Sequence, residues 1–202
     1  MIKIFLTLLL FIVLPMSLDA RRNGAGFFMG YGLGATHYDD RGAADNIGAS
    51  NSDFSGASKL YMGYKYDHDF TLEGSITNYG YFKIKKDGET FEEFIPMSTA
   101  IYINYGHDFI HNQLRPFMIL GAGLLWINGK KYAIYDEEVF FSLHYGFGLL
   151  YTPNFLYGWG IRYAYEADWS RYATTSEARA LGAKNDYNNF LGTVYLGVQY
   201  KF

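Results

Sequence analysis

From residue 27 onward, bulky apolar residues alternate with small or polar ones along most of the chain. Between Phe27 and Tyr38, one set of alternate positions is bulky and apolar, while the other is mainly glycine. Because successive side chains of a β-strand point to opposite faces, this pattern predicts a strand with one apolar face. The same pattern predicts eight strands in all, over residues 27–38, 57–66, 70–82, 97–109, 114–128, 139–151, 157–169 and 189–202.

The segments between the predicted strands alternate in length. Three are short, at residues 67–69, 109–113 and 152–155. Four are longer and more polar, at residues 39–56, 83–96, 129–138 and 170–188, the last with a helical turn after Ser176. Short turns at one end and long loops at the other are typical of an up-and-down barrel. The chain is therefore predicted to be all-β and to form an eight-stranded antiparallel β-barrel.

Two classes of eight-stranded barrel differ in which face is apolar. A soluble lipocalin-like barrel keeps its apolar side chains inside and its polar ones in water. Here Tyr157 to Tyr165 carries a continuous row of large apolar residues at alternate positions, and each of the seven remaining predicted strands has such a row. Soluble monomers tolerate apolar patches of only roughly a few hundred Å². Lipid accommodates such rows, and closure of the barrel satisfies the backbone. A transmembrane barrel is therefore predicted, with aromatic residues such as Trp126 and Trp169 near the membrane interfaces.

The first twenty residues have a different composition. One positive charge at Lys3 precedes the uncharged apolar block Ile4 to Leu14, and a short polar stretch follows as far as Ala20. This order is typical of a secretory signal peptide, and the apolar block is too short to span a bilayer comfortably. An N-terminal membrane anchor is the alternative. We expect a signal peptide over residues 1–20 and a barrel domain over 21–202, with a mature N-terminus at Arg21.

Charge and cysteine content exclude several classes of protein. The 202 residues have a net charge of −3 and include no cysteine, while 20% of them are aromatic. Nothing in that balance would neutralise a phosphate backbone, so no nucleic-acid partner is expected. Without cysteine, the chain has neither a disulfide scaffold nor a thiolate metal site.

Charged residues also occur at positions predicted to face the barrel interior. They carry both signs and lie on several strands: Lys59, Lys65, Glu73, Arg115, Arg162 and Glu166. The interior of an eight-stranded barrel is just wide enough for side chains to fill it. We therefore expect a structural network of buried ion pairs rather than an ion path, with Glu73 and Arg115 as a favoured pair.

Catalytic and cofactor sites are weakly supported. Ser142, His144 and Glu166 are the residue types of a nucleophile, a base and an orienting acid, but no motif ties them to a reaction. The glycines between Gly30 and Gly34 lie inside a predicted strand with no helix after it, so a phosphate loop is excluded. They are expected instead to relieve crowding in the barrel. We expect no catalytic residue, no cofactor and no metal site.

Three short motifs give the chain a family resemblance. Residues 114–117 (LRPF) are followed by Gly121-Ala122-Gly123, Leu72-Glu73-Gly74 lies on an earlier strand, and the C-terminus ends in Gly197, Tyr200 and Phe202. In these motifs the chain resembles the small outer-membrane barrels of the OmpA-like superfamily, in the barrel domain only. The resemblance implies that Gly197, Tyr200 and Phe202 form a signal read by the outer-membrane assembly machinery.

Together these features predict an integral protein of the cell outer membrane with no enzymatic activity. Its expected role is structural or surface interaction, with a side-chain-filled lumen. The alternatives are a narrow channel or carrier for small or hydrophobic molecules and, with less support, an enzyme that modifies lipid A. Expected partners are outer-membrane lipid and lipopolysaccharide, the assembly machinery and a surface ligand held by the long loops. The protein is expected to be a monomer.

Overall fold

The protein is described by a computed structural model that covers residues 25–46, 48–51, 54–86, 89–129, 138–180 and 182–202. The expected signal peptide, and the cleavage site between Ala20 and Arg21, lie outside the described residues. The elements are β1 (Gly26–Asp39), α2 (Ala43–Asn46), β2 (Ala49–Asn51), β3 (Phe54–Lys65), β4 (Phe70–Asn78), β5 (Phe82–Lys86), β6 (Glu89–Gly106), β7 (Leu114–Gly129), β8 (Val139–Tyr151), β9 (Trp159–Ala173), α3 (Ser176–Ala180) and β10 (Asp186–Lys201).

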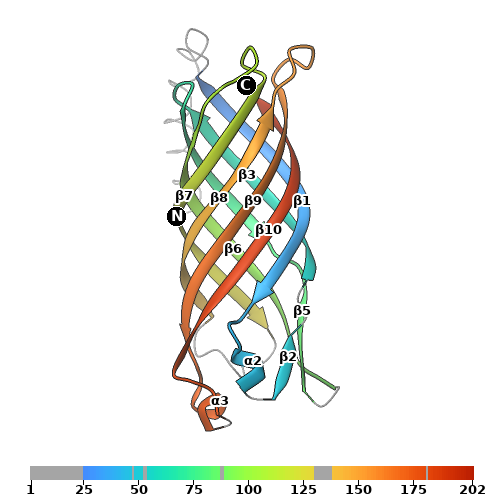
Figure 1. Cartoon of the computed structure of the whole chain (residues 1–202), viewed down its shortest axis with the longest axis vertical. Coiled ribbons are helices and arrows are strands. Elements are labelled where there is room, and N and C mark those ends of the chain that lie inside the picture. Colours follow the sequence, from blue (N-terminus) through green and yellow to red (C-terminus); the bar gives the residue numbers. More distant parts are fainter. Residues whose placement is uncertain (1–24, 47, 52–53, 87–88, 130–137, 181) are drawn as a thin grey trace, which may run out of the picture.

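Eight of these strands close into a barrel, as the sequence predicts (Figure 1). Neighbours are antiparallel in the order β6, β4, β3, β1, β10, β9, β8 and β7, and the pairing of β6 with β7 completes the ring. The helical turn expected after Ser176 is α3. We call the end that carries α2, α3, β2 and β5 the loop end, and the opposite end, where the C-terminus and the short turns lie, the turn end.

One predicted loop is wrong. Residues 83–96 were expected to be irregular, but β5 and the first part of β6 pair there antiparallel, with a register shift after Ile84. The apolar side chains that face inward are few and lie among Lys and Glu residues, so the alternation is hard to recognise. Phe82, Ile84 and Phe94 are nevertheless buried. This hairpin extends the sheet beyond the barrel, and β2 adds to its edge.

The two faces of the barrel have the predicted character. Ile161 and Leu196 point outward with 42% and 59% of their surface exposed, whereas Arg162, next to Ile161, is only 1% exposed. Aromatic side chains, including Tyr66, are exposed near the turn end, where an interfacial belt is expected. The outer surface is therefore the lipid-facing one.

Glycines on the inner face make room for large aromatic side chains. A Cβ atom at Gly30 would lie 2.4 Å from the ring of Tyr61. One at Gly121 would lie 2.2 Å from the carbonyl oxygen of Ile101 and 2.4 Å from Cβ of Tyr102. The expected role of these glycines in relieving crowding is confirmed at both positions.

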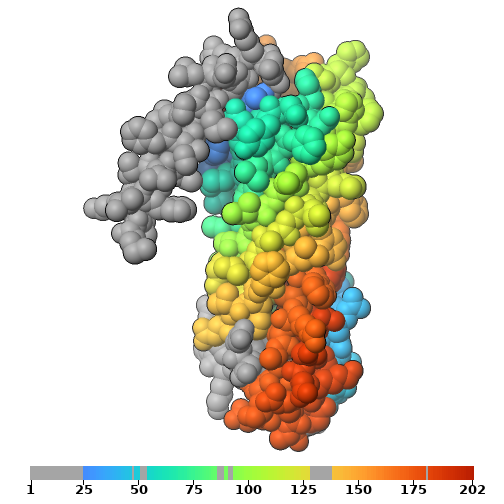
Figure 2. All heavy atoms as spheres, turned by 90° about the vertical axis from the view of Figure 1, so that its left-hand side faces the viewer, coloured from blue at the N-terminus to red at the C-terminus, as the bar shows by residue number. Residues whose placement is uncertain are grey.

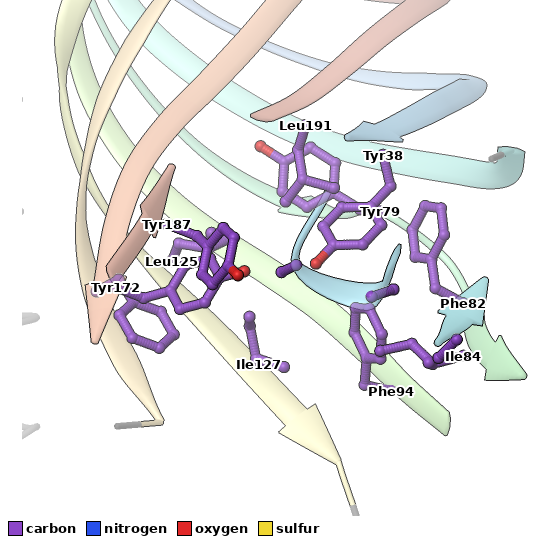
Figure 3. Packing of buried hydrophobic residues seen from close by; sticks show 14 residues of the cluster. Tyr38, Tyr79, Phe82, Ile84, Phe94, Leu125, Ile127, Tyr172, Tyr187 and Leu191 are labelled. Carbon is purple, nitrogen blue, oxygen red and sulfur yellow. The ribbon is translucent and has the colours of Figure 1, made fainter. Parts of the chain in front are cut away.

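At the loop end, the interior is filled by apolar side chains. Figure 3 shows Tyr38, Phe82 and Leu191 converging there from β1, β5 and β10. We call this set the loop-end cluster; it comprises Tyr38, Ala43, Ala44, Ala49, Tyr79, Phe82, Ile84, Phe94, Leu125, Ile127, Phe140, Tyr172, Tyr187 and Leu191. Because α2 contributes Ala43 and Ala44, a long loop folds onto the barrel mouth rather than extending into solvent.

The loop that carries α2 is fixed by Asp40. Its carboxylate accepts hydrogen bonds from the amides of Gly42 and Ala44, at 3.0 and 2.9 Å, and so satisfies an amide in the first turn of α2. Burial raises the pKa of Asp40 above its ordinary value, although these two amides act in the opposite direction.

In the space-filling view the molecule is elongated, and the segment around α3 covers part of the loop end (Figure 2).

Candidate functional site

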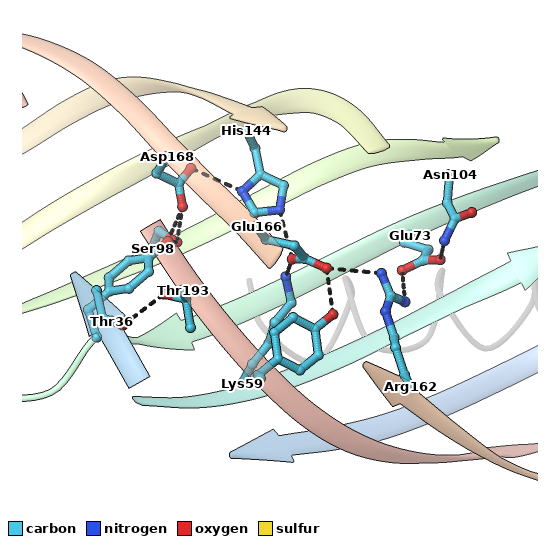
Figure 4. Close-up of polar contacts among 12 residues, drawn as sticks. Thr36, Lys59, Glu73, Ser98, Asn104, His144, Arg162, Glu166, Asp168 and Thr193 are labelled. Carbon is cyan, nitrogen blue, oxygen red and sulfur yellow. Dashed lines mark hydrogen bonds and ion pairs between the residues drawn. The ribbon is translucent and has the colours of Figure 1, made fainter. Parts of the chain in front are cut away.

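The centre of the barrel holds a connected set of charged and titratable side chains (Figure 4). We call it the lumen network; it comprises Lys59, Glu73, His144, Arg162, Glu166 and Asp168. Arg162 on β9 donates from Nη1 to Glu73 on β4 at 2.7 Å, and from Nη2 to Glu166 at 3.0 Å. In the closed ring β4 and β9 are four strands apart in either direction, so they lie on opposite walls. Arg162 therefore connects opposite walls of the lumen.

Glu166 is the second branching point of the lumen network. Its carboxylate contacts Lys59 from β3, and it accepts a hydrogen bond from the hydroxyl of Tyr195 at 2.5 Å. Nε2 of His144 lies 3.2 Å from the same carboxylate. Each oxygen of this buried carboxylate thus has a cationic or hydrogen-bonding partner, which offsets the cost of removing the charge from water.

Asp168 is a member that sequence reasoning missed. It is fully buried, 3.2 Å from Nδ1 of His144, and it accepts hydrogen bonds from Ser142, Ser98 and Tyr79. Asp168 has the same parity on β9 as Arg162 and Glu166, and that parity was the available signal.

A neutral imidazole has a single N–H, so both contacts of His144 are hydrogen bonds only when its ring is protonated.

Aromatic rings surround the cationic side chains. The guanidinium carbon of Arg162 lies 4.4 Å from the ring centroid of Phe117 and 4.8 Å from that of Tyr61. Nζ of Lys59 lies 5.0 Å from the ring centroid of Tyr102. Contacts of this kind favour a cation that has lost its water. The middle of the barrel is therefore occupied by interlocked charged and aromatic side chains.

The expected pairing of Glu73 with Arg115 is wrong. The amide of Asn104 lies between them: its Nδ2 donates to Glu73 at 2.6 Å, while its Oδ1 accepts from Arg115 at 2.8 Å. Arg115 also donates to the carbonyl of Asp69 at 2.9 Å, and its Nε is 3.9 Å from Asp108. Arg115 begins β7 at the turn end, too far from Glu73 for direct contact once the strands are staggered.

Lys65 lies near the turn end, apart from the lumen network. Its Nζ is 2.8 Å from Oδ2 of Asp108. The other five residues expected to face the lumen, Lys59, Glu73, Arg115, Arg162 and Glu166, are all buried. The structure therefore brings Lys59, Glu73, Arg162 and Glu166 into direct contact, connects Arg115 through Asn104, and leaves Lys65 at the barrel entrance.

The geometry offers little to a nucleophilic mechanism. The hydroxyl of Ser142 donates to Asp168 at 2.9 Å, and His144 is held between Asp168 and Glu166. A nucleophilic mechanism usually requires a hydrogen bond between the nucleophile and its base. Here the hydroxyl of Ser142 donates to Asp168 instead of to His144. Within the described ranges, no group of three or more His, Asp or Glu residues is placed to hold a metal ion.

The three residues of the expected assembly signal lie on β10 and just beyond it. Gly197 faces inward, whereas Tyr200 and Phe202 are exposed on the outer surface with ring centroids 5.1 Å apart. The amide of Phe202 donates to the carbonyl of Phe27 at 2.9 Å, next to the start of β1. The two aromatic residues therefore lie at the seam where the first and last strands of the barrel meet.

The closed barrel has an apolar outside and a charged inside, and its sequence matches a known protein family. The model of the outer membrane protein beta-barrel domain family matches residues 5–202. The chain belongs to this family. No curated protein matches the sequence. In the described part of the chain, the helices are too short or too polar to cross a membrane.

Several solved outer membrane proteins share the fold. Neisserial surface protein A is 16% identical, with a TM-score of 0.59 over 89% of this chain and 100% of that one. Outer membrane protein AlkL, solved in DMPC bilayers, is 13% identical, with a TM-score of 0.59 over 88% and 90%. OprG from Pseudomonas aeruginosa is 15% identical, with a TM-score of 0.56 over 88% and 96%. At these identities the likeness concerns the fold, and with the family it locates the protein in the outer membrane.

Proposed function

We propose that this protein is a non-enzymatic, non-conducting outer-membrane barrel with a structural or surface-interaction role. The observation that carries the proposal is the contact of Arg162 with Glu73 and Glu166, which joins opposite walls of the lumen. To pass this point, an ion would have to separate the buried charges of Arg162, Glu73 and Glu166. These charges are stabilised almost entirely by their partners in the lumen network. Breaking such a pair costs about 3–5 kcal/mol.

The loop-end cluster supports the surface-interaction role. It fixes α2 and the β5–β6 hairpin against the barrel mouth, so that these segments form an ordered platform. Long loops of outer-membrane barrels face the cell exterior. The surface ligand of the platform and the surrounding lipopolysaccharide are thus the partners that we propose, for a barrel that acts as a monomer.

Planar-bilayer recording of the refolded protein tests the closed lumen. The wild type is expected to give no steady ohmic current. As an opened reference, the variant Arg162→Ala/Glu73→Ala removes both sides of the ion pair, while Lys83→Ala/Glu93→Ala removes an ion pair at the loop end whose side chains are each 42% exposed. No current is expected from the second variant, and a current from the first would identify Arg162 and Glu73 as part of the barrier. A steady current through the wild type would instead support the narrow channel.

The other roles considered have separate tests. Uptake of a hydrophobic reporter that depends on the protein, without ionic conductance, would support a carrier. Altered acylation of lipid A in cells that lack the protein would support an enzyme, and failure of a Ser142→Ala variant to restore the normal acylation would support Ser142 as its nucleophile. We expect neither result, because the lumen network closes the path that a carrier needs, and because Ser142 and His144 are both engaged by Asp168.

The route to the membrane is part of the same proposal. A signal peptide over residues 1–20 would direct export, and Gly197, Tyr200 and Phe202 would be read by the assembly machinery. N-terminal sequencing of the protein from outer-membrane fractions is expected to begin at Arg21. Retention of Met1 in an inner-membrane fraction would contradict this route. Phe202→Ala is expected to lower the amount in the outer membrane more than it lowers refolding yield in vitro.

A further inference from the structure

A cavity of about 610 Å³ lies at the turn end, separate from the loop-end platform. All eight barrel strands contribute to its lining, together with the turn at residues 153–158. At the mouth, His68 and Tyr157 are exposed. This volume falls within the range of about 300–1,000 Å³ that is usual for sites of small molecules.

The charges around the cavity are unequal. Among the described residues, four cationic side chains line it (Lys65, Arg115, Arg162 and Lys201), against two carboxylates (Glu73 and Asp108). Glu73 is paired with Arg162, and Asp108 is 2.8 Å from Lys65. Nε of Arg115 is buried and lies 3.9 Å from Asp108, but it makes no hydrogen bond among the described residues. The cavity therefore has a positive excess and a buried donor that favour an anion.

Part of the cavity wall is apolar. Phe28 and Phe117 are buried side chains of the mid-barrel aromatic cluster, and Leu150 packs against the same cluster. All three line the cavity. Below them the lumen network ends the cavity, so a ligand that entered here would have its apolar part against these rings and its charged part near Lys65, Arg115 and Lys201.

We propose that this cavity binds an anionic, single-chain amphiphile from the periplasmic side, with its carboxylate or phosphate head at the cationic mouth and its chain against Phe28, Phe117 and Leu150. This binding does not require conduction through the lumen. A carboxylate head would indicate a free fatty acid, whereas a phosphate head would indicate a monoacyl phospholipid. Both share the anionic head and the single chain that the cavity fits.

The test uses the refolded protein in nanodiscs of zwitterionic lipid and a decanoate that carries a photoreactive diazirine near its chain end. After irradiation, labelled peptides are identified by mass spectrometry. Labelling is expected on peptides that contain Phe28, Phe117 or Leu150. Unlabelled decanoate and decyl phosphate compete in separate arms, and the stronger competitor identifies the head group. Decanol and decyltrimethylammonium serve as the neutral and cationic controls.

Matched variants separate the cavity from the surrounding lipid. Leu150→Trp fills the cavity and is expected to abolish labelling there, whereas Leu149→Trp, on the lipid-facing side, is expected to leave it unchanged. Lys201→Gln is expected to weaken competition by decanoate about tenfold, the usual scale for loss of one interaction with a charged group. Lys83→Gln, at the loop end, is the charge control. Circular dichroism confirms that each variant is folded.

Two results would overturn the proposal. One is labelling confined to lipid-facing peptides, which would mean that the probe is held by the bilayer alone. The other is equal competition by decanoate and decyltrimethylammonium, since a site selected by its positive charge discriminates against a cation. Neither result bears on conductance, so the proposed closed lumen is tested separately.

Discussion

Arg162 and Glu73 are 89 residues apart in the sequence, yet the guanidinium of one donates to the carboxylate of the other over 2.7 Å. They lie on β9 and β4, which face each other across the barrel. Both side chains are 2% exposed. The pair therefore holds opposite walls together with both side chains almost fully buried, and loss of Arg162 would leave the Glu73 carboxylate without its cationic partner.

The first prediction is strong energetic coupling between these two residues. Glu73→Gln and Arg162→Gln are each expected to lower the free energy of unfolding by about 3–5 kcal/mol. The double variant should cost clearly less than the two single losses together, because no charge is stranded. Unfolding in urea measures all four proteins.

A second cycle on Lys83→Gln and Glu93→Gln is the control for this coupling. Those side chains are each 42% exposed, so their coupling should be about 1 kcal/mol or less. Equal coupling in the two cycles would mean that the lumen is hydrated and its charges screened. A cycle on Glu73→Gln and Arg115→Gln should give an intermediate value, because Asn104 relays their contact.

The second prediction concerns the register of β9. Ile161→Arg places a charge on the lipid-facing surface near the turn end of β9, where we expect a cost below the about 2–4 kcal/mol that arginine has at the middle of the bilayer. Ala164→Ser adds one hydroxyl on the inner face and is expected to cost much less. Urea titration in lipid vesicles compares the two. Similar losses of stability would contradict the outward orientation of Ile161.

The third prediction concerns the close approach of β7 to β6. Gly121→Ala would force a Cβ atom against the backbone of Ile101 and Tyr102, and neither backbone can move without disturbing the sheet. We expect a loss of about 1–3 kcal/mol, the usual cost of overpacking. Gly56→Ala on β3, where a Cβ atom meets nothing within 4 Å, should be nearly neutral. An equal effect at both positions would point to backbone propensity instead of crowding.

The fourth prediction concerns pH and the turn between β3 and β4. The amides of Phe70 and Asp69 donate to the Asp67 carboxylate at 2.7 and 2.8 Å, and these bonds hold its pKa below the ordinary value. A depressed pKa in the folded state stabilises the protein above the unfolded pKa of about 3.9. That stabilisation is lost as the pH falls through the folded pKa.

Urea unfolding of the wild type and of Asp67→Ala across this acidic range checks the prediction. The wild type should be the more stable protein near neutral pH, and the difference should shrink in acid. NMR titration of the Asp67 carboxyl should show a pKa below the ordinary value. A difference that does not change with pH would mean that the carboxylate acts through shape and not through its charge.

Local periodicity determined which way each side chain faces. Alternation at period two is a property of a single strand, so the sequence predicted Ile161 outside and Arg162 inside without any partner strand. Closure followed too, because apolar rows on every strand need lipid outside and paired edges between strands. The burial of Lys59, Glu73, Arg115 and Glu166 could be predicted on the same ground.

The tertiary structure alone decided which of these side chains meet. Contacts across a barrel depend on the stagger of its strands and on the four-strand separation of β4 from β9, and no local pattern encodes either quantity. For that reason the sequence pairs Glu73 with Arg115. The burial of Asp168, by contrast, follows from its parity on β9, which it shares with Arg162 and Glu166. The loop-end cluster escaped prediction for a related reason: Ala43, Phe82 and Leu191 come from segments far apart in sequence, and they form a core only when the closed barrel brings its loops together.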